Sequence, residues 1–399
     1  MGDITVRIVA ESEEFKTLKG VWDGLLRKCG SDKSIYLTHE WQSTWWKHFG
    51  AGKKLNILLI EKEKQVIGII PLVKVRYGIG LIGVDTLETI GSVNSNYVWL
   101  VTPDNREEVM SALLAYLGEE LDRNKVLLML TYIPESSKFL NLLRRNGNPF
   151  SRNTIIRERV MTLAPYIPLP ATWDEYFASL SQNRRYIINR AMRALSEEGH
   201  RVQLQQYGAD SMDAALSKLF AFHRRRWESL NIPSAFSDSR IREFYGEIAR
   251  QFLGKNWLYF SCLTVDDEIV STNYYFVYNR KLYACITARD TEYSDYGIGH
   301  LHRALAIKDA IEKHLQEYDF LKGDEPYKFY WTKSARRYIE VIMLKKGFWH
   351  GLRLRFLHVI MRLGCIKHYG LRGIFSQYQI NRREREERKK MRPKISLIP

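Results

Sequence analysis

The chain has 399 residues, of which 45% are hydrophobic and 27% are charged. At roughly 150 residues per domain this length predicts two or three domains, and the composition excludes a disordered chain. The net charge of +16 attracts anions, but residues 348–399 alone hold 13 Lys and Arg against three Asp and Glu. The main body is therefore only mildly basic, and a nucleic-acid partner is not expected there.

The cysteines and the first residues indicate the cellular compartment in which the protein works. The four cysteines lie far apart with no CxxC pair, which suggests neither a disulfide framework nor a metal site. The chain opens on a strand-like pattern without a secretory signal, and it holds no run of 18 apolar residues. We predict a cytoplasmic protein that binds no metal.

Apolar spacing in the first part of the chain predicts alternating helices and strands. Thr38 is a plausible N-cap, and the charged turn 62–64 separates two apolar strands. The predicted strands are 3–10, 55–61, 65–75, 80–90, 97–101 and 125–132, and the predicted helices are 14–29, 38–49, 106–123 and 137–147.

Three prolines, Pro165, Pro168 and Pro170, predict a joint between domains 1–165 and 166–348. The second domain repeats the order of helices, a strand meander, a helix and further strands, which indicates an internal duplication. Its predicted helices start at Thr172, Asn183, Ser211 and Gly299, and its predicted strands are 200–207, 257–265, 268–278, 281–288, 318–321 and strands within 333–348.

A glycine turn after a strand carries the chemistry. Gly297 and Gly299 open an apolar-periodic helix, and the N–H groups of its first turn, with the helix dipole, suit a pyrophosphate. A simple tight turn is the alternative. The predicted cofactor-binding residues here are Gly297, Ile298, Gly299, His300 and Leu301.

One helix later, residues 319–328 read DFLKGDEPYK, a cluster of ionisable residues at the end of a strand. The alternative interpretation is a solvated turn held by one ion pair. Lys328 is a candidate anion-binding group, although it could equally pair with Asp319.

These two motifs in this order resemble the GNAT domain of cellulose-biosynthesis-type (CelD-like) acetyltransferases, which are relatives of the FemAB aminoacyltransferases. Segments at 37–50, 68–72, 173–193 and 219–227 add to the resemblance. It implies a mixed α/β fold of tandem GNAT domains, each a central sheet flanked by helices. Domain 1–165 would be degenerate and domain 166–348 would bind acetyl-CoA or another acyl-CoA. Ser294 departs from the family, which usually has Arg or Gln there.

The implied reaction is direct attack of an acceptor on a thioester, which needs a base, a donor to the thioester oxygen and an acid for the thiolate. Asp290 and Glu325 are the favoured bases, although Asp290 could simply cap a turn. The catalytic candidates are Asp290, Glu325, Asp324, Tyr327 and His223, and the acceptor-binding candidates are Arg184, Arg185, Arg226 and Trp227.

The basic tail, 349–399, predicts an amphipathic helix over 352–367 that suits an anionic membrane surface. Packing back on the protein is the alternative. A membrane role suits an amine or hydroxyl acceptor on a small molecule, a sugar or an envelope-polysaccharide precursor. Two other functions remain open: FemAB-like aminoacyl transfer from tRNA, and a non-catalytic membrane- or nucleic-acid-binding protein on a GNAT scaffold.

Overall fold

The computed structural model describes residues 3–30, 33–78, 83–91, 101–103, 107–123, 126–145, 150, 153–346 and 396–397. The chain divides into two compact units, with boundaries after Leu163 and after Ala335. We call the part up to Leu163 together with the stretch from Arg336 unit 1, and Ala164–Ala335 unit 2. The predicted joint lies within two residues of the first boundary. The predicted end of the second domain at 348 is wrong, because the chain re-enters unit 1 at Arg336.

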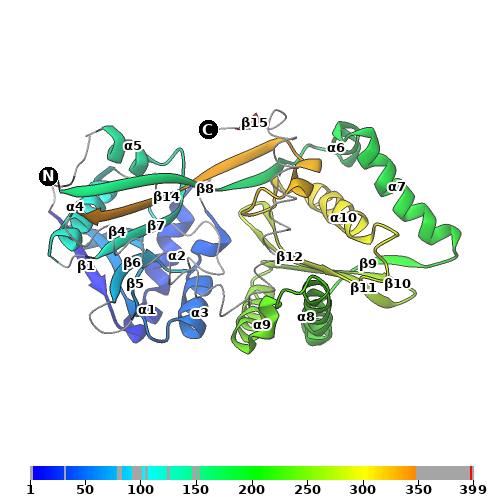
Figure 1. Ribbon diagram of the computed structural model, residues 1–399, viewed down its shortest axis with the longest axis horizontal. Coiled ribbons are helices and arrows are strands. Elements are labelled where there is room, and N and C mark those ends of the chain that lie inside the picture. Colours follow the sequence, from blue (N-terminus) through cyan, green and yellow to red (C-terminus); the bar gives the residue numbers. More distant parts are fainter. Residues whose placement is uncertain are drawn as a thin grey trace. The chain divides into compact units, whose positions relative to one another are not determined.

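The described residues of unit 1 form two sheets and five α-helices, whose arrangement is drawn in Figure 1. One sheet has the strand order β1-β3-β4, and the other runs β2-β5-β6-β7-β14-β8. The strands are β1 (Ile4–Val9), β2 (Lys54–Leu55), β3 (Ile57–Lys62), β4 (Gln65–Ile70), β5 (Leu72–Tyr77), β6 (Val84–Thr89), β7 (Leu127–Pro134), β8 (Thr154–Pro168) and β14 (Ser334–Lys345). The helices are α1 (Ser12–Thr17), α2 (Lys19–Lys28), α3 (His39–Phe49), α4 (Glu107–Arg123) and α5 (Lys138–Arg145).

The core of unit 1 forms where α4 and α5 cover the strands. Leu113, Leu117 and Leu121 lie one helical turn apart on α4 and are fully buried against strand residues such as Leu128 and Val341. Thr38 caps α3 as predicted, since its hydroxyl accepts from the Trp41 N–H.

Unit 2 contains one sheet with helices on both faces. Its strand order is β8-β13-β12-β11-β10-β9, and Figure 1 shows α8 and α9 on one face and α6, α7 and α10 on the other. The strands are β9 (Val202–Gln206), β10 (Leu258–Val265), β11 (Glu268–Tyr278), β12 (Lys281–Arg289) and β13 (Glu317–Asp319). The helices are α6 (Trp173–Ser179), α7 (Gln182–Glu197), α8 (Met212–Glu228), α9 (Ser239–Leu253), α10 (Ile298–Glu312) and the 3₁₀-helix η6 (Pro326–Tyr330).

The two units repeat one order of elements, as the sequence pattern predicts. In unit 1, β6 is followed by α4 and the parallel strand β7; in unit 2, β12 is followed by α10 and the parallel strand β13. An antiparallel strand then closes each arrangement, β14 beside β7 and β8 beside β13. Each mixed sheet is flanked by helices, so the predicted α/β class is confirmed.

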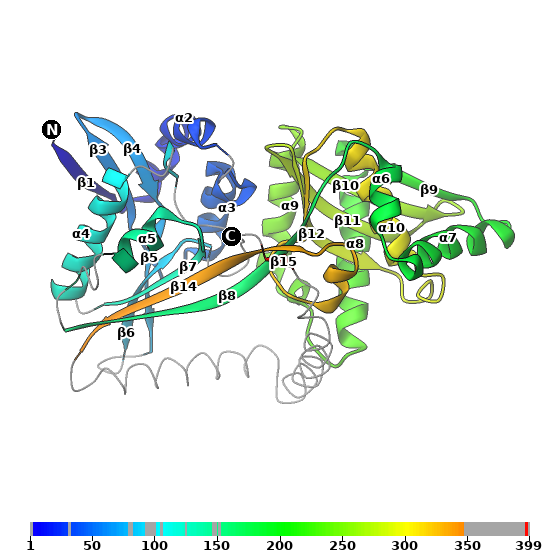
Figure 2. The same ribbon diagram turned by 90° about the horizontal axis from the view of Figure 1, so that it is seen from above.

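The chain exchanges the closing strands of the two arrangements. β8 follows the helices of unit 1, yet its last residues, Tyr166–Pro168, pair with β13 of unit 2. β14 follows β13, yet Tyr338–Met343 pair with β7 of unit 1. β8 and β14 are themselves neighbours in the strand order (Figure 2). The proline segment is therefore part of a strand and not a loose linker.

Sequence patterns missed α9, whose buried Phe244, Ile248 and Phe252 have clear helical spacing. The predicted strand 97–101 lies almost wholly outside the described residues. So does the basic tail, of which only β15 (Ser396–Leu397) is described, paired parallel to β14 at Ser334 and Ala335. Among the described helices, none combines the length and the apolar character that crossing a membrane requires.

Candidate active site

The glycine turn starts α10 as the sequence predicts. Gly297 is the N-cap residue with φ of 69°, in the left-handed region that glycine adopts without strain, and no side chain caps the helix. The first turn contains no acidic residue. The side chains of Ile298 and Leu301 are buried in the core, so of these two residues only the backbone can face a ligand. The positive end of the α10 dipole is thus left for an anion.

Gly299 leaves room for an arginine beside this helix end. A Cβ atom at Gly299 would lie 3.0 Å from Nη1 and 3.3 Å from Cδ of Arg289, the last residue of β12. Burial, then the positive charges of Arg226 and Arg303, lower the pKa of Arg289. Any side chain larger than hydrogen at position 299 would therefore push against Arg289.

His300 and Arg184 form the next part of the site. Nη1 of Arg184, on α7, donates to Nδ1 of His300 at 3.0 Å. A guanidinium can only donate, so the imidazole is neutral at Nδ1 and carries its proton on Nε2. Burial, followed by Arg184, Arg303 and Arg289, lowers the pKa of His300 to about 4. The ring therefore presents an N–H donor at neutral pH.

A third arginine, Arg303, lies one turn further along α10. Its guanidinium lies 5.0 Å from the ring centre of Tyr327 and 5.8 Å from that of Trp331. Arg184 is only 5% exposed and lies over the rings of Tyr330 and Trp331, at 4.8 and 5.3 Å. Aromatic faces thus support both cations.

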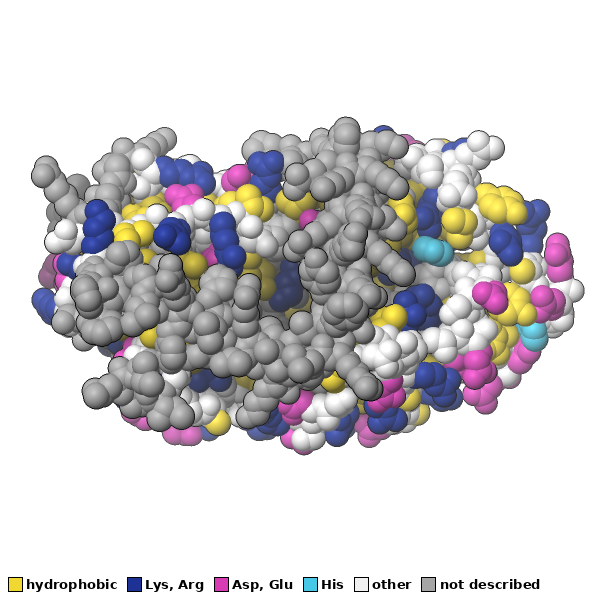
Figure 3. Space-filling view, viewed as in Figure 1, with side chains coloured by type: hydrophobic (Ala, Val, Ile, Leu, Met, Phe, Trp, Pro, Cys, Tyr) yellow, Lys and Arg dark blue, Asp and Glu magenta, His cyan; other side chains and the backbone are white. Residues whose placement is uncertain are grey.

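We call Arg184, Arg289 and Arg303 the arginine cluster. Within the part of the chain that the structure describes, none of the three forms an ion pair with a carboxylate. The Nε atoms of Arg184 and Arg303 are also buried without a hydrogen-bond partner there. Figure 3 shows Lys and Arg side chains and a His gathered where Figure 1 draws α7 and α10. Three neighbouring guanidinium groups without an acid indicate a site for an anion.

The hydrogen-bonded pairing of β12 with β13 ends near the arginine cluster. β12 and β13 pair in parallel only from Lys281–Glu317 to Tyr283–Asp319. β13 ends at Asp319, whereas β12 continues to Arg289. Cys285 lies on this continuation and is half-buried.

Lys322 follows the end of β13. Burial lowers the pKa of its ammonium group to about 8, with a raising effect of Cys285 and a lowering effect of Lys328. An amine with this pKa exchanges a proton readily near neutral pH.

Lys328 does not meet the expectation of an anion-binding group. Its buried ammonium donates to the carbonyl oxygens of Lys322, at 2.7 Å, and Gly323, at 3.4 Å, and lies 2.9 Å from Oε2 of Glu325. These contacts hold the loop after β13. The predicted Asp319–Lys328 pair is replaced by Glu325–Lys328, while Asp319 accepts from the Leu321 N–H at 2.7 Å.

The geometry argues against proton transfer by His223. Its Nε2 accepts from the indole N–H of Trp227 at 2.9 Å, and its Nδ1 lies 2.8 Å from the Ser234 hydroxyl. Both ring nitrogens are therefore used inside the fold, and burial lowers the pKa of His223 to about 4. Trp227, predicted to bind the acceptor, stacks on this histidine.

Asp290 takes the alternative, turn-capping role. Its Oδ1 accepts from the Glu292 N–H at 3.2 Å and from Nη1 of Arg225 at 3.1 Å.

The remaining candidates lie in different settings. Arg185 donates to the Ala178 carbonyl at 2.8 Å, and Arg226 is exposed on α8, where its charge acts on Arg289. Tyr327 is 39% exposed and Glu325 partly exposed, so both remain accessible. The fifth catalytic candidate, Asp324, is half-buried in the loop between β13 and η6.

Sequence reasoning missed Arg289, Arg303 and Lys322. Arg303 had a weak signal, since it is a charged residue in a helix whose other positions are mostly apolar. Arg289 and Lys322 had none, because their importance depends on where β12 and β13 diverge.

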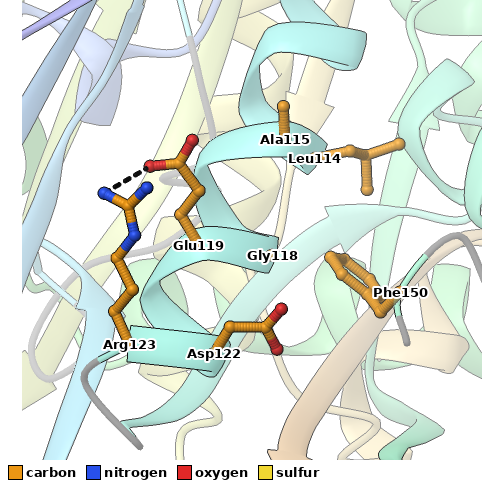
Figure 4. Close-up of a pocket in the computed structure, with 7 residues that line it drawn as sticks. All are labelled: Leu114, Ala115, Gly118, Glu119, Asp122, Arg123 and Phe150. Atoms are coloured by element: carbon orange, nitrogen blue, oxygen red, sulfur yellow. Dashed lines mark ion pairs between the residues drawn. The ribbon is translucent and has the colours of Figure 1, made fainter. Parts of the chain in front are cut away.

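Unit 1 has a pocket of about 400 Å³ on α4 (Figure 4). Glu119 pairs with Arg123 at 3.5 Å and Asp122 with Lys345, so its charges are neutralised within the unit. Among the described residues of the whole chain, no group of three or more His, Cys, Asp or Glu could hold a metal ion.

Comparison with known proteins identifies the domain in which these residues lie. Residues 182–329 match the family model described as an acetyltransferase (GNAT) domain, which is less than half of the chain but includes the whole of α7, β12 and α10. No curated protein matches the sequence. The matched residues form a GNAT acetyltransferase domain, and the protein is a transferase.

Solved structures share the fold over both units. FemX has 10% identity and a TM-score of 0.56, covering 88% of this chain and 100% of its own. The C-terminal domain of a putative lysylphosphatidylglycerol synthetase from Agrobacterium fabrum has 9% identity and a TM-score of 0.50, covering 91% and 100%. L-PGS from Bacillus licheniformis has 8% identity and a TM-score of 0.50, covering 86% and 96%. At these identities the likeness shows the fold alone.

Proposed function

We propose that unit 2 transfers an acyl group from acyl-CoA to an amine or hydroxyl acceptor by direct attack. The observation that carries the proposal is the arginine cluster at the uncapped start of α10, where no carboxylate of the described residues pairs with any of the three guanidinium groups. A pyrophosphate supplies two charges at this position, and each charge-assisted hydrogen bond contributes ~1.5–3 kcal/mol. As part of this proposal, the chain is of the CelD-like type, and unit 1 is a degenerate GNAT domain that does not bind the acyl donor.

The end of the β12–β13 ladder is the proposed place of the thioester. Backbone groups of β12 beyond Tyr283 would donate to its oxygen. Lys322, with a pKa of about 8, would protonate the departing thiolate, and Glu325 or Asp324 would take the proton of the acceptor. Tyr327 is the alternative acid, close to Arg303.

The test is a thermal-shift titration of the whole protein with acetyl-CoA, longer acyl-CoAs and free CoA. A ligand that binds only the folded state at 100 times its Kd stabilises by ~2.7 kcal/mol, which gives a clear shift. The chain-length preference would narrow the donor. A protein that responds to none of these thioesters would contradict the proposal.

The second candidate is aminoacyl transfer from tRNA. The fold shared with FemX and with a protein named as a lysylphosphatidylglycerol synthetase favours it, and the arginine cluster would suit RNA phosphates equally. Activity in a cell extract that disappears after RNase treatment, but survives removal of CoA, would support this donor over acyl-CoA.

We also propose that the tail brings the enzyme to an anionic membrane, where a lipid-linked or envelope-polysaccharide acceptor would be met. Arg355, Arg362 and Lys367 are three of the basic residues of its predicted amphipathic helix, which also contains Arg353. Replacing all three by glutamine should abolish co-sedimentation with phosphatidylglycerol vesicles. Unchanged sedimentation would refute this role and favour a tail that packs on the protein.

A further inference from the structure

The outward side of α7 combines basic and hydrophobic side chains. Its inward side carries Ala191 and Leu195, which share a buried core with Ile298 of α10. Residues 182–196 include four arginines and no acid, and the first acid, Glu197, is the last residue of the helix. α7 therefore presents a basic surface on the side that it does not use for packing.

Two arginines at the centre of this side have no acidic partner. Tyr186, Arg190 and Arg193 follow one another at spacings of four and three residues, so they share one helical face, and all three are exposed. Neither Arg190 nor Arg193 forms an ion pair with any described residue. The helix dipole does not account for Arg190, because its effect is confined to the last turn and Arg190 lies before that turn. Both cations can therefore meet an anionic surface without giving up an existing pair.

Hydrophobic side chains accompany these arginines. Tyr186 is 55% exposed, and Met192, on the flank of the same side, is 38% exposed. Figure 3 shows hydrophobic and basic side chains next to one another where Figure 1 draws α7. Tyrosine is enriched at membrane–water interfaces, because its ring is apolar and its hydroxyl is polar. We call Tyr186, Arg190, Met192 and Arg193 the α7 face.

We propose that the α7 face docks on an anionic lipid bilayer. The proposal extends the membrane role from the tail to the folded part of unit 2, and it does not depend on the proposed reaction. A basic residue near an anionic membrane surface contributes about fivefold in partition, so two arginines alone bind weakly. Together with the tail they form two contacts on one molecule, and each contact strengthens the other. Because α7 carries Arg184 on its inward side, the docked membrane would lie one helix away from the arginine cluster.

RNA is the other polyanion that two free arginines could meet, and the hydrophobic members of the α7 face favour lipid over it. A phosphate backbone offers nothing to the side chain of Met192, whereas partial burial among acyl chains removes its apolar surface from water. Tyr186 fits the headgroup level of a bilayer for the same reason.

The experiment is co-sedimentation of the full-length protein with vesicles of phosphatidylglycerol and phosphatidylcholine, and with vesicles of phosphatidylcholine alone. Replacing Arg190 and Arg193 together by glutamine should lower partition to the phosphatidylglycerol vesicles about 20-fold, at about fivefold for each charge. Tyr186→Ala with Met192→Ser should lower it severalfold. This second loss should persist at high salt, where screening removes the contribution of the arginines.

Two arginines of α9 provide the matched control. Arg240 and Arg250 are exposed on the other face of the sheet of unit 2, and they pair with Asp238 at 2.8 Å and with Asp213 at 2.9 Å. Replacing both by glutamine removes the same charge from the protein, yet sedimentation should match that of the native protein. CoA affinity should be native in the variants of the α7 face, since none of its members belongs to the arginine cluster.

Each outcome decides. If the Arg190 and Arg193 variant sediments like the native protein, the α7 face does not dock on lipid, even where the tail variant loses binding. Equal losses from the α7 pair and the α9 pair would show a general effect of net charge and would also overturn the proposal. Weaker binding to an RNA duplex at unchanged sedimentation would assign the α7 face to RNA instead. Failure of CoA to bind bears on the proposed reaction alone.

Discussion

Two helices hold the same place in the strand order of their units, α4 after β6 and α10 after β12, yet their first turns have opposite character. α4 begins with Glu107 and Glu108, and Glu108 pairs with Lys62 at 2.7 Å. α10 begins with a left-handed glycine and no acid, beside the arginine cluster. Acidic side chains already satisfy the positive end of the α4 dipole, so only α10 offers it to a ligand. Repetition of a fold thus does not repeat its binding chemistry.

The largest effect is expected from closing the gap at Gly299. In Gly299→Leu the side chain would displace Arg289 and cover the start of α10, so CoA affinity should fall about 100-fold, the loss of about two charge-assisted contacts. Calorimetry measures this directly.

Gly118 of α4 provides the matched control, since a Cβ there would meet Phe150 at an ordinary 3.4 Å. Gly118→Ala should leave CoA affinity unchanged. Equal affinity of Gly299→Leu and the native protein would contradict a phosphate site at α10.

Removing one arginine of the cluster should lower the affinity for CoA without lowering the stability of the ligand-free protein. Arg289→Ala should weaken CoA about tenfold or more, through one lost charge-assisted contact. The ligand-free Tm should not fall, because the substitution relieves repulsion from Arg226 and Arg303. In unit 1, Arg76 pairs with Asp85 at 2.7 Å on the surface, so Arg76→Ala should change neither quantity appreciably. A lower ligand-free Tm with unchanged affinity would instead make Arg289 a structural residue.

The sequence predicts the skeleton of this site better than its charges. A Gly-x-Gly before an apolar-periodic helix was enough to locate the start of α10, because glycine in the left-handed region has a local cause. Arg289 and Arg303 meet only through the packing of β12 against α10, so no local pattern marks them. The hydrogen bonds of His223 could be predicted only in part. Trp227 lies four residues later on the same helix face, whereas Ser234 comes from a separate turn.

The fold shows the same division between local and distant causes. Helical and strand periodicity predicted most elements, whereas the exchange of β8 and β14 could not be predicted. The burial of β8 does not alternate, since Arg157–Val160 are exposed and Ala164–Ile167 are all buried, and nothing in Thr154–Pro168 states which partner each half will pair with. The boundary between the two units is therefore set by the strands with which β8 and β14 pair, and not by the prolines.

Acidification should weaken unit 2 through its buried histidines. Burial lowers the pKa of His223 from 6.5 to about 4. Above pH 6.5 both folded and unfolded states are neutral; below it the unfolded chain takes up the proton first, so stability is lost progressively down to about pH 4. At pH 5 this loss is about 2 kcal/mol for one imidazole.

Hydrogen exchange at pH 7 and pH 5 measures this unit by unit. Peptides of unit 2 should lose protection on acidification, and His223→Gln, which can still bond Trp227 and Ser234, should lose less. Equal losses in the native protein and the variant would show that His223 does not titrate as its burial demands.

The smallest effect is expected at Asp290, although the sequence favoured it as a base. Its carboxylate accepts from the Glu292 N–H and from Arg225, contacts that close the turn after β12. Asp290→Asn keeps an oxygen for the N–H and loses only an ion pair to Arg225, whose side chain is 57% exposed, so kcat should change by about twofold or less. A general base contributes ~10²–10⁴ in rate, so a fall of 100-fold at unchanged KM would restore Asp290 to the reaction. Because Asp290 adjoins Arg289, CoA affinity must be measured together with kcat. Weaker CoA binding at unchanged kcat would mean that the turn positions Arg289, and Glu325 or Asp324 would remain the proposed base for the proton of the acceptor.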